Sequence, residues 1–163
     1  MAARRLTLSA LLAAVAVACL FLSVLIPQLD LTAVALAAIA VALSLEKNGV
    51  RYGVLTFVAA AILAWLMLPD KIPAMYFSVL LGPYPLLSYG LNKLPGKALP
   101  WIAKLGAEAA LAVGCYLVFT WAFTDVEGPL WMLALMLALY LAVVVFYELA
   151  AARLVKLLAA RIK

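Results

Sequence analysis

The stretch LTLSALLAAVAVACLFLSVLI, residues 6–26, contains no charged side chain. An α-helix rises about 1.5 Å per residue, so a helix of this length crosses the roughly 30 Å hydrocarbon core of a bilayer. Arg4 and Arg5 precede the stretch, and Pro27 follows it. The sequence therefore predicts a transmembrane helix at residues 6–26.

Apolar runs of the same kind fill the remaining chain. Of 163 residues, 71% are hydrophobic and 12% are charged, whereas soluble domains contain about 45–50% apolar residues. No linker or shift in composition divides the chain, so a single domain covering residues 1–163 is expected. Its expected class is an all-α integral membrane protein with six transmembrane helices. The candidate spans are residues 6–26, 31–45, 52–68, 72–91, 105–123 and 129–147.

The positive charges predict the orientation of these spans, because cytoplasmic loops of membrane proteins carry the excess of Lys and Arg. In the six-span arrangement Lys71 stands alone on one side, together with Asp30, Asp70, Asp125 and Glu127. The other side carries Arg4, Arg5, Lys47, Arg51, Lys93, Lys97, Lys104, Arg153, Lys156, Arg161 and Lys163. A multi-pass protein of the cell membrane with both termini in the cytoplasm is therefore expected. The basic residues flank apolar runs, which favours membrane lipid over nucleic acid as their partner.

The N-terminus allows one alternative. Arg4 and Arg5, an apolar stretch and the box Ala16-Val17-Ala18-Cys19 resemble a signal peptide with a lipoprotein-type cleavage site. The apolar run continues past Cys19 to Ile26, as in a membrane span, which favours an uncleaved first helix.

Enzymatic activity is not expected. The chain contains no His, the commonest metal ligand and the side chain that titrates most easily near neutral pH. It also lacks a P-loop or any other nucleotide motif. Neither a cofactor nor a metal site is therefore expected.

Gly82-Pro83-Tyr84-Pro85 interrupts the fourth span. Each proline removes a backbone donor and clashes with the carbonyl four residues earlier, so a kink or unwound turn is expected near residues 80–85. Transporters use such breaks at binding sites, whereas a simple packing kink is the alternative.

Two acidic residues, Glu108 and Glu148, lie within the apolar runs or at their ends. An acid at membrane depth is a functional candidate, and Glu108 is a possible coupling acid for protons or cations. The alternative is a pair of interfacial ion pairs, because Lys104 precedes Glu108 by four residues and Arg153 follows Glu148 by five. The basic, proline-containing stretch at residues 92–104 is expected to form an interfacial loop or short helix.

Near the outer ends of the spans, Tyr76, Trp121, Asp125 and Trp131 could line an outward-opening substrate pocket. The alternative is that these aromatic residues form the belt that membrane proteins place at each interface.

Ala10, Ala14 and Ala18 repeat at a spacing of four residues on the first span. Such a stripe of small residues lets another helix approach closely. Because the same spacing recurs at Ala33 and Ala37 and at Ala60 and Ala64, packing within the bundle is the alternative.

With six short spans, cytoplasmic ends and this alanine stripe, the chain resembles the substrate-binding S components of energy-coupling-factor transporters. The resemblance implies that Ala10, Ala14 and Ala18 dock on a membrane-embedded coupling subunit driven by cytoplasmic ATPases. It also implies a small-molecule ligand, such as a vitamin or another metabolite, in an outward-facing pocket. The cell-shape protein MreD is similar in size and number of spans, so a structural or regulatory membrane subunit is the alternative.

Overall fold

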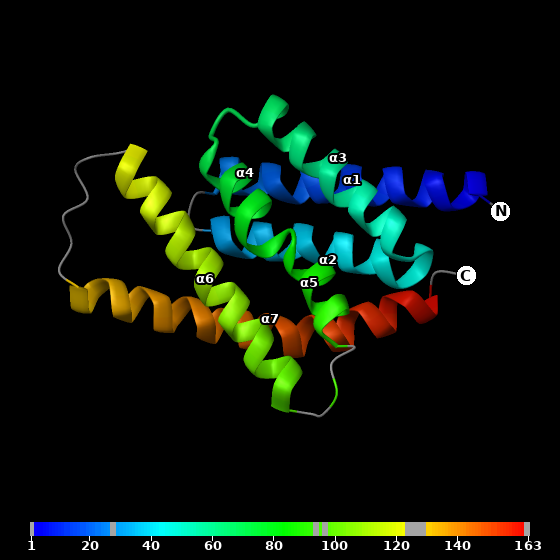
Figure 1. Ribbon diagram of the computed structural model, residues 1–163. Helices are drawn as coiled ribbons and strands as arrows, with labels where there is room; N and C mark the ends of the chain where they lie inside the picture. The colour runs from blue at the N-terminus through cyan, green and yellow to red at the C-terminus, as the bar shows by residue number, and fades with distance from the viewer. Residues whose placement is uncertain (1, 27–28, 93–94, 96–97, 123–129, 162–163) are drawn as a thin grey trace.

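The part of the chain that the computed structural model describes, residues 2–26, 29–92, 95, 98–122 and 130–161, is all-helical (Figure 1). None of these residues lies in a β-strand. The helices are α1 (Ala2–Leu25), α2 (Asp30–Asn48), α3 (Val50–Met67), α4 (Ile72–Tyr76), the π-helix η2 (Phe77–Leu81), α5 (Tyr84–Leu91), α6 (Ala98–Ala122) and α7 (Leu130–Arg161).

Within the described residues, three segments are long and apolar enough to cross a membrane, by their length and composition. They are Ala3–Leu25, Val50–Met67 and Leu137–Val155. The all-helical expectation is therefore confirmed, and these segments fit a membrane protein.

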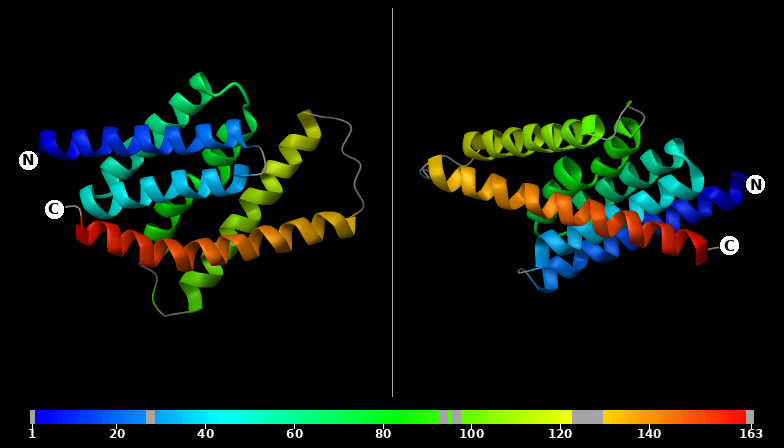
Figure 2. Two further views of the ribbon diagram at one scale, coloured as in Figure 1. Left: turned by 180° about the vertical axis from the view of Figure 1, so that it is seen from behind. Right: turned by 90° about the horizontal axis from the view of Figure 1, so that it is seen from below.

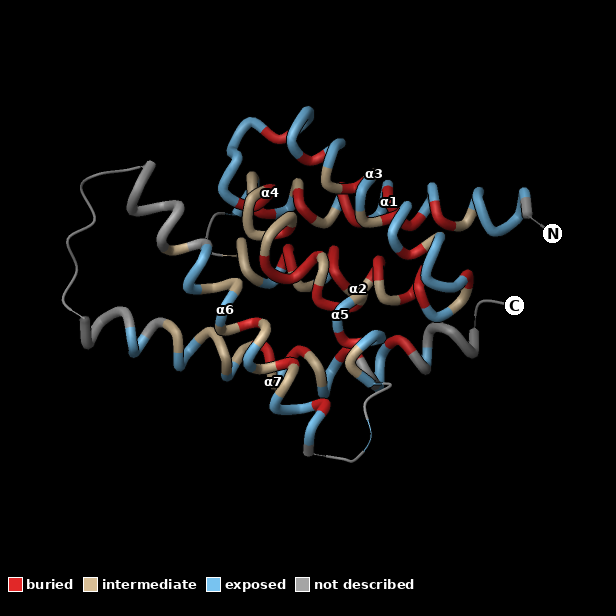
Figure 3. Tube along the Cα trace, viewed as in Figure 1, coloured by how far each residue is buried: buried red, intermediate tan, exposed pale blue. Residues whose placement is uncertain are grey.

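Helix α2 lies at the centre of the fold (Figure 3). It contacts α1, α3, α4, η2, α5 and α7. Ala33, Ala37 and Ala38 are fully buried, because small side chains let neighbouring helices approach the α2 backbone closely. Ala60 and Ala64 of α3 are also fully buried, so the alanine repeats on α2 and α3 serve internal packing.

A buried polar network ties α1, α2 and α3 together. The Ser44 hydroxyl lies 2.7 Å from the Thr56 hydroxyl and 3.3 Å from the Ser9 hydroxyl, and Asn48 Nδ2 donates to Ser9 Oγ at 3.0 Å. The Thr56 hydroxyl also donates to the Tyr52 carbonyl in its own helix at 2.8 Å. Because these groups satisfy one another, they can be buried among apolar helices at little cost.

The turn between α2 and α3 depends on two glycines. Gly49 adopts φ 91°, a left-handed conformation that residues with a Cβ rarely adopt. A Cβ on Gly53 would lie 2.9 Å from Leu45 Cδ1, so the absent side chain lets α3 pack tightly on the end of α2.

The fourth predicted span is interrupted, and its pieces are α4, η2 and α5. At the break, the Gly82 amide donates to the Phe77 carbonyl at 2.9 Å, which is the five-residue step of a π-helix. The π-helical turn begins at Phe77, so the interruption starts three residues earlier than the predicted range of residues 80–85. Gly82 has ordinary helical φ and ψ angles, but a Cβ there would clash with the Phe77 carbonyl oxygen and lie 2.7 Å from Phe57 Cε2. Its role is therefore to provide space for this turn.

Two helices have different bounds from those expected. Helix α6 begins at Ala98, so residues 98–104 belong to it and do not form a separate interfacial segment. Pro100 is compatible with this start, because the first turn of a helix needs no backbone donor. Helix α7 has 32 residues, about 48 Å at 1.5 Å per residue, and runs well past the predicted end at residue 147.

The connections between helices divide between the two ends of the bundle. The first turns of α1, the α2–α3 turn and the last turns of α7 lie at one end (Figures 1 and 2). The α1–α2 and α3–α4 connections lie at the other end. Lys71 in the α3–α4 connection donates from Nζ to the carbonyls of Trp65 at 2.7 Å and Leu68 at 2.6 Å, which satisfies the C-terminus of α3.

Candidate functional site

A carboxylate on α7 joins three helices. Glu148 Oε2 accepts a hydrogen bond from the Tyr84 hydroxyl at 2.7 Å, and Oε1 accepts one from the Ser88 hydroxyl at 3.3 Å. Lys104 Nζ of α6 lies 2.5 Å from Oε1 and forms an ion pair with it. The Lys104 and Glu148 side chains are 4% and 17% exposed, so this pair is held inside the protein.

The observed ion pair differs from the pairs suggested by the sequence. Lys104 pairs with Glu148 on the neighbouring helix, although Glu108 lies one turn away from it on α6. Lys104 and Glu108 share the face of α6 that packs toward α7, which brings Lys104 within reach of Glu148. Arg153 is exposed. The suggested pairing of Lys104 with Glu108 is therefore wrong. The Lys104 ammonium also lies 5.7 Å from the centre of the Trp101 ring.

Glu108, the possible coupling acid, is fully buried. Its Oε2 accepts a hydrogen bond from the Tyr140 hydroxyl of α7 at 2.7 Å. Its Oε1 has no hydrogen-bond partner among the described residues. A buried oxygen without a partner is costly, so Glu108 is a second polar feature of the α6–α7 contact that packing alone does not explain.

The helix break positions the donors to Glu148. Pro83 precedes α5 and Pro85 lies in its first turn, where a helix tolerates the missing backbone donor. Tyr84 is the first residue of α5, and Ser88 follows one turn later on the same face. The break therefore restarts the helix so that both hydroxyl groups reach one carboxylate.

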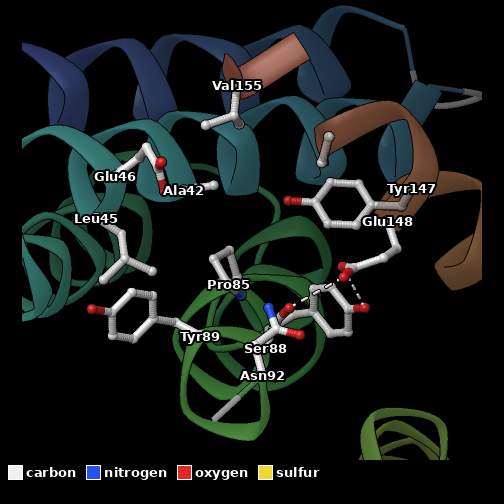
Figure 4. A pocket seen from close by; sticks show the side chains of 12 residues that line it. Ala42, Leu45, Glu46, Pro85, Ser88, Tyr89, Asn92, Tyr147, Glu148 and Val155 are labelled. Carbon is white, nitrogen blue, oxygen red and sulfur yellow. Dashed lines mark hydrogen bonds between the residues drawn. The ribbon is translucent and has the colours of Figure 1, made fainter. Parts of the chain in front are cut away.

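A cavity of about 270 Å³ adjoins this cluster, between α2, α5 and α7 (Figure 4). Glu46, Tyr89 and Asn92 are exposed, so the cavity opens to the surface near them. Its lining consists of Ala42, Leu45 and Glu46 from α2, Tyr84, Pro85, Ser88, Tyr89 and Asn92 from α5 and the residue after it, and Tyr147, Glu148, Ala151 and Val155 from α7.

Tyr147 is the unusual residue of the lining. Its side chain is 6% exposed, and its hydroxyl has no hydrogen-bond partner among the described residues. The ring packs edge-on against Tyr84, with centroids 5.6 Å apart and an interplanar angle of 74°. In Figure 4 the hydroxyl points away from Glu148, toward the space bounded by Ala42 and Pro85. The ring is thus held by packing, whereas the hydroxyl has no role within the described structure.

The predicted outer pocket is only partly covered by the structure. Tyr76 is half-buried at the end of α4 and does not line the cavity beside Glu148. The side chains of Trp121 and Trp131, and the whole of Asp125, lie outside the described residues. The described cavity lies toward the end of the bundle that contains the α2–α3 turn, which is the end expected to face the cytoplasm.

The predicted docking residues Ala10, Ala14 and Ala18 are all exposed on α1, whereas Ala13 and Ala16 are buried against the bundle. Packing between the described helices therefore does not use this stripe. Gly106, Ala110 and Gly114 of α6 and Ala134, Ala138 and Ala142 of α7 are also exposed, so α1 is one of three described helices with such a face.

At the opposite end of the bundle, the charge of one acid acts on another. Burial raises the pKa of the Asp30 carboxyl above its ordinary value, and the negative charge of Asp70 raises it further. Asp70 Oδ1 accepts a hydrogen bond from the Ile72 amide at 3.0 Å, at the start of α4.

Comparison with protein-family models, with curated proteins and with solved structures gave no match to this chain. The chemistry of the cluster and the cavity is therefore the basis for a function. Among the described residues, no group of three or more Cys, Asp or Glu side chains could hold a metal ion.

Proposed function

We propose that this chain is the substrate-binding subunit of a membrane transporter and carries a small molecule across the bilayer with energy supplied by partner subunits. It spans the membrane six times, through α1, α2, α3, the broken segment α4–η2–α5, α6 and α7. Both termini face the cytoplasm, where the excess of Lys and Arg lies.

One observation supports transport most directly: a cavity lies beside a broken helix and a buried ion pair. Charged groups at membrane depth cost free energy to bury, which suggests that Lys104 and Glu148 are retained for a function. Broken helices in membranes occur where protein or a water-filled cavity covers the freed backbone groups. A cavity lined by both polar and apolar side chains is the usual form of a small-molecule site.

The exposed stripe of Ala10, Ala14 and Ala18 supports a partner subunit. Small side chains let a second helix approach the α1 backbone closely, and this face remains uncovered by the described helices. We assign it to a membrane-embedded coupling subunit that carries cytoplasmic ATPases, because the chain itself has no nucleotide motif.

A structural or regulatory subunit, comparable to the MreD type, is the second candidate. It needs only a packed bundle and a partner-facing surface, and the same alanine stripe would supply the surface. The cavity distinguishes the two functions, because a scaffold has no need of a space beside Glu148.

Purification from the native membrane in a mild detergent tests the proposal. Mass spectrometry of the purified complex is expected to find a coupling subunit and a retained small molecule. Recovery of the chain with neither would contradict transport. Recovery with structural proteins alone, and no small molecule, would favour the scaffold.

Site-specific photo-cross-linking tests the docking face. A photoreactive residue at Ala14 is expected to cross-link to the coupling subunit. The same residue at Ile62, which is 55% exposed on α3, serves as the control and is expected to cross-link to lipid. Equal cross-linking of the coupling subunit from both positions would contradict the assignment of the α1 face.

A further inference from the structure

We infer that the cavity between α2, α5 and α7 binds a small primary amine, whose ammonium group donates to the Tyr147 hydroxyl and is attracted by the acidic lining. This inference rests on the proposed function and names the class of substrate.

The charges of the lining favour a cation. Its charged members are Glu46 and Glu148, both acidic. Lys104 does not line the cavity, and it contacts Glu148 through Oε1. A carboxylate oxygen can accept two hydrogen bonds, and Oε2 accepts one within the described structure, from Tyr84. Oε2 therefore retains the capacity to accept a bond from a ligand ammonium.

The Tyr147 hydroxyl is the second, independent observation. It is buried, lines the cavity and has no partner among the described residues. Burial of an unpaired hydroxyl costs stability, which a bound ligand would recover by supplying the partner. An ammonium N–H can donate to the phenolic oxygen, and the acidic lining attracts its positive charge. A small primary amine supplies both the donor and the charge.

The remaining lining selects the rest of the ligand. Leu45, Pro85 and Val155 provide an apolar wall, and Tyr84 and Tyr89 add aromatic rings that attract cations as well as apolar groups. At about 270 Å³ the cavity is slightly smaller than typical pockets of roughly 300–1,000 Å³ for drug-sized ligands. The ligand is therefore a compact amine with an apolar body.

Binding of three probes of similar shape tests this inference. The full chain in lipid nanodiscs is titrated calorimetrically with 2-phenylethylamine, 2-phenylethanol and 3-phenylpropionate, and empty nanodiscs correct for partition into lipid. We expect the amine to bind at least tenfold more tightly than the neutral alcohol or the anion. Binding of the alcohol or the anion as tightly as the amine, or binding of none of the three, would overturn the inference.

Two variants connect the binding to the cavity. Tyr147→Phe keeps the ring and its contact with Tyr84, and it removes a hydroxyl that forms no bond in the described structure. It is expected to unfold at no lower temperature than the parent and to bind the amine at least fivefold more weakly. Tyr52→Phe, on α3 outside the cavity, is the control and should bind like the parent. Equal amine affinity for Tyr147→Phe and the parent would refute the role of the hydroxyl in binding.

Glu148→Gln should abolish the preference for the amine over the alcohol. Because this variant leaves Lys104 without its partner and can fail to fold, the Tyr147→Phe result decides the matter independently. Mass spectrometry of the complex purified from the native membrane distinguishes amine binding from transport itself. A non-amine small molecule retained from the native membrane would overturn the amine and leave transport standing, whereas absence of any ligand and any coupling subunit would contradict transport.

Discussion

The Tyr84 hydroxyl donates a hydrogen bond of 2.7 Å to Glu148 Oε2, across 64 positions of the sequence. Tyr84 lies at the point where the interrupted fourth span resumes as α5, and Glu148 lies on α7. The hydrogen bond ties the restart of the helix to the carboxylate that lines the cavity. It connects two unusual local features of the sequence, a proline-broken apolar segment and an acid at the end of an apolar run.

The buried ion pair gives the first prediction. Lys104→Met or Glu148→Gln alone leaves one buried charge without compensation, which typically costs about 3–5 kcal/mol. The double variant removes both charges and is expected to be less destabilised than the sum of the single variants. Unfolding by sodium dodecyl sulfate in bicelles measures the double-mutant cycle. Additive losses would show that the two side chains do not interact in the membrane.

Gly82 gives the second prediction. Gly82→Ala places a methyl group against the Phe77 carbonyl oxygen and 2.7 Å from the Phe57 ring. Overpacking of this kind typically costs about 1–3 kcal/mol. Gly90→Ala, where the added methyl meets nothing within 4 Å, is the matched control and should be neutral or stabilising. The same unfolding assay compares them, and equal stability of the two variants would contradict the described π-helical turn.

The broken span gives the third prediction. Replacement of Pro83 and Pro85 by alanine restores two backbone donors and is expected to straighten the segment, which moves Tyr84 and Ser88 away from Glu148. The protein should remain folded in detergent but lose transport and amine binding. Circular dichroism and calorimetric binding check both parts. Unchanged binding with altered thermal stability would indicate that the break serves packing only.

Asp30 gives a prediction for pH dependence. Its pKa is raised in the folded protein, so the folded state holds the proton more strongly than the unfolded state does. The resulting stability is fully present below the ordinary Asp pKa and is lost as the pH rises through the raised value. Asp30→Asn should remove this dependence and stabilise the protein at pH 7, by less than about 1 kcal/mol because the group is partly exposed. The free energy of unfolding of the parent and the variant is measured at pH 3 and pH 7. The prediction is refuted if the change in this free energy between the two pH values is the same in both proteins.

Much of the fold followed from the sequence because hydrophobic runs and turn residues act locally. The turn at Gly49 and the interruption at Gly82-Pro83-Tyr84-Pro85 are found where these residues predicted them. The sequence predicts an interfacial segment at residues 92–104, whereas α6 begins at Ala98, because the first turn of a helix accepts a proline such as Pro100. The predicted last span ends at residue 147, where the charge-free run stops, whereas α7 continues to Arg161.

The candidate site was less predictable, because its contacts join distant helices. The sequence alone marks Glu108 and Glu148 as acids in or beside apolar runs, and it marks Tyr84 as part of the helix break. No local pattern predicts that Lys104 pairs with Glu148. The same applies to Tyr147, which no sequence pattern singles out. Only the three-dimensional structure shows that its buried hydroxyl has no partner among the described residues.

Accessibility of the cavity to water-soluble reagents tests the central claim most directly. Ala151, a buried residue of the lining, is replaced by cysteine in a chain whose Cys19 and Cys115 are replaced by alanine. The exposed Ala138 on the same helix, expected to face lipid, is the control position. In inside-out vesicles, we expect Ala151→Cys to react faster with a cationic than with an anionic methanethiosulfonate. We also expect 2-phenylethylamine to slow this reaction and Ala138→Cys to remain unmodified. An Ala151→Cys thiol that is inert in folded protein, or that reacts equally with both reagents and without protection, would contradict a cation-binding cavity that opens to the cytoplasm.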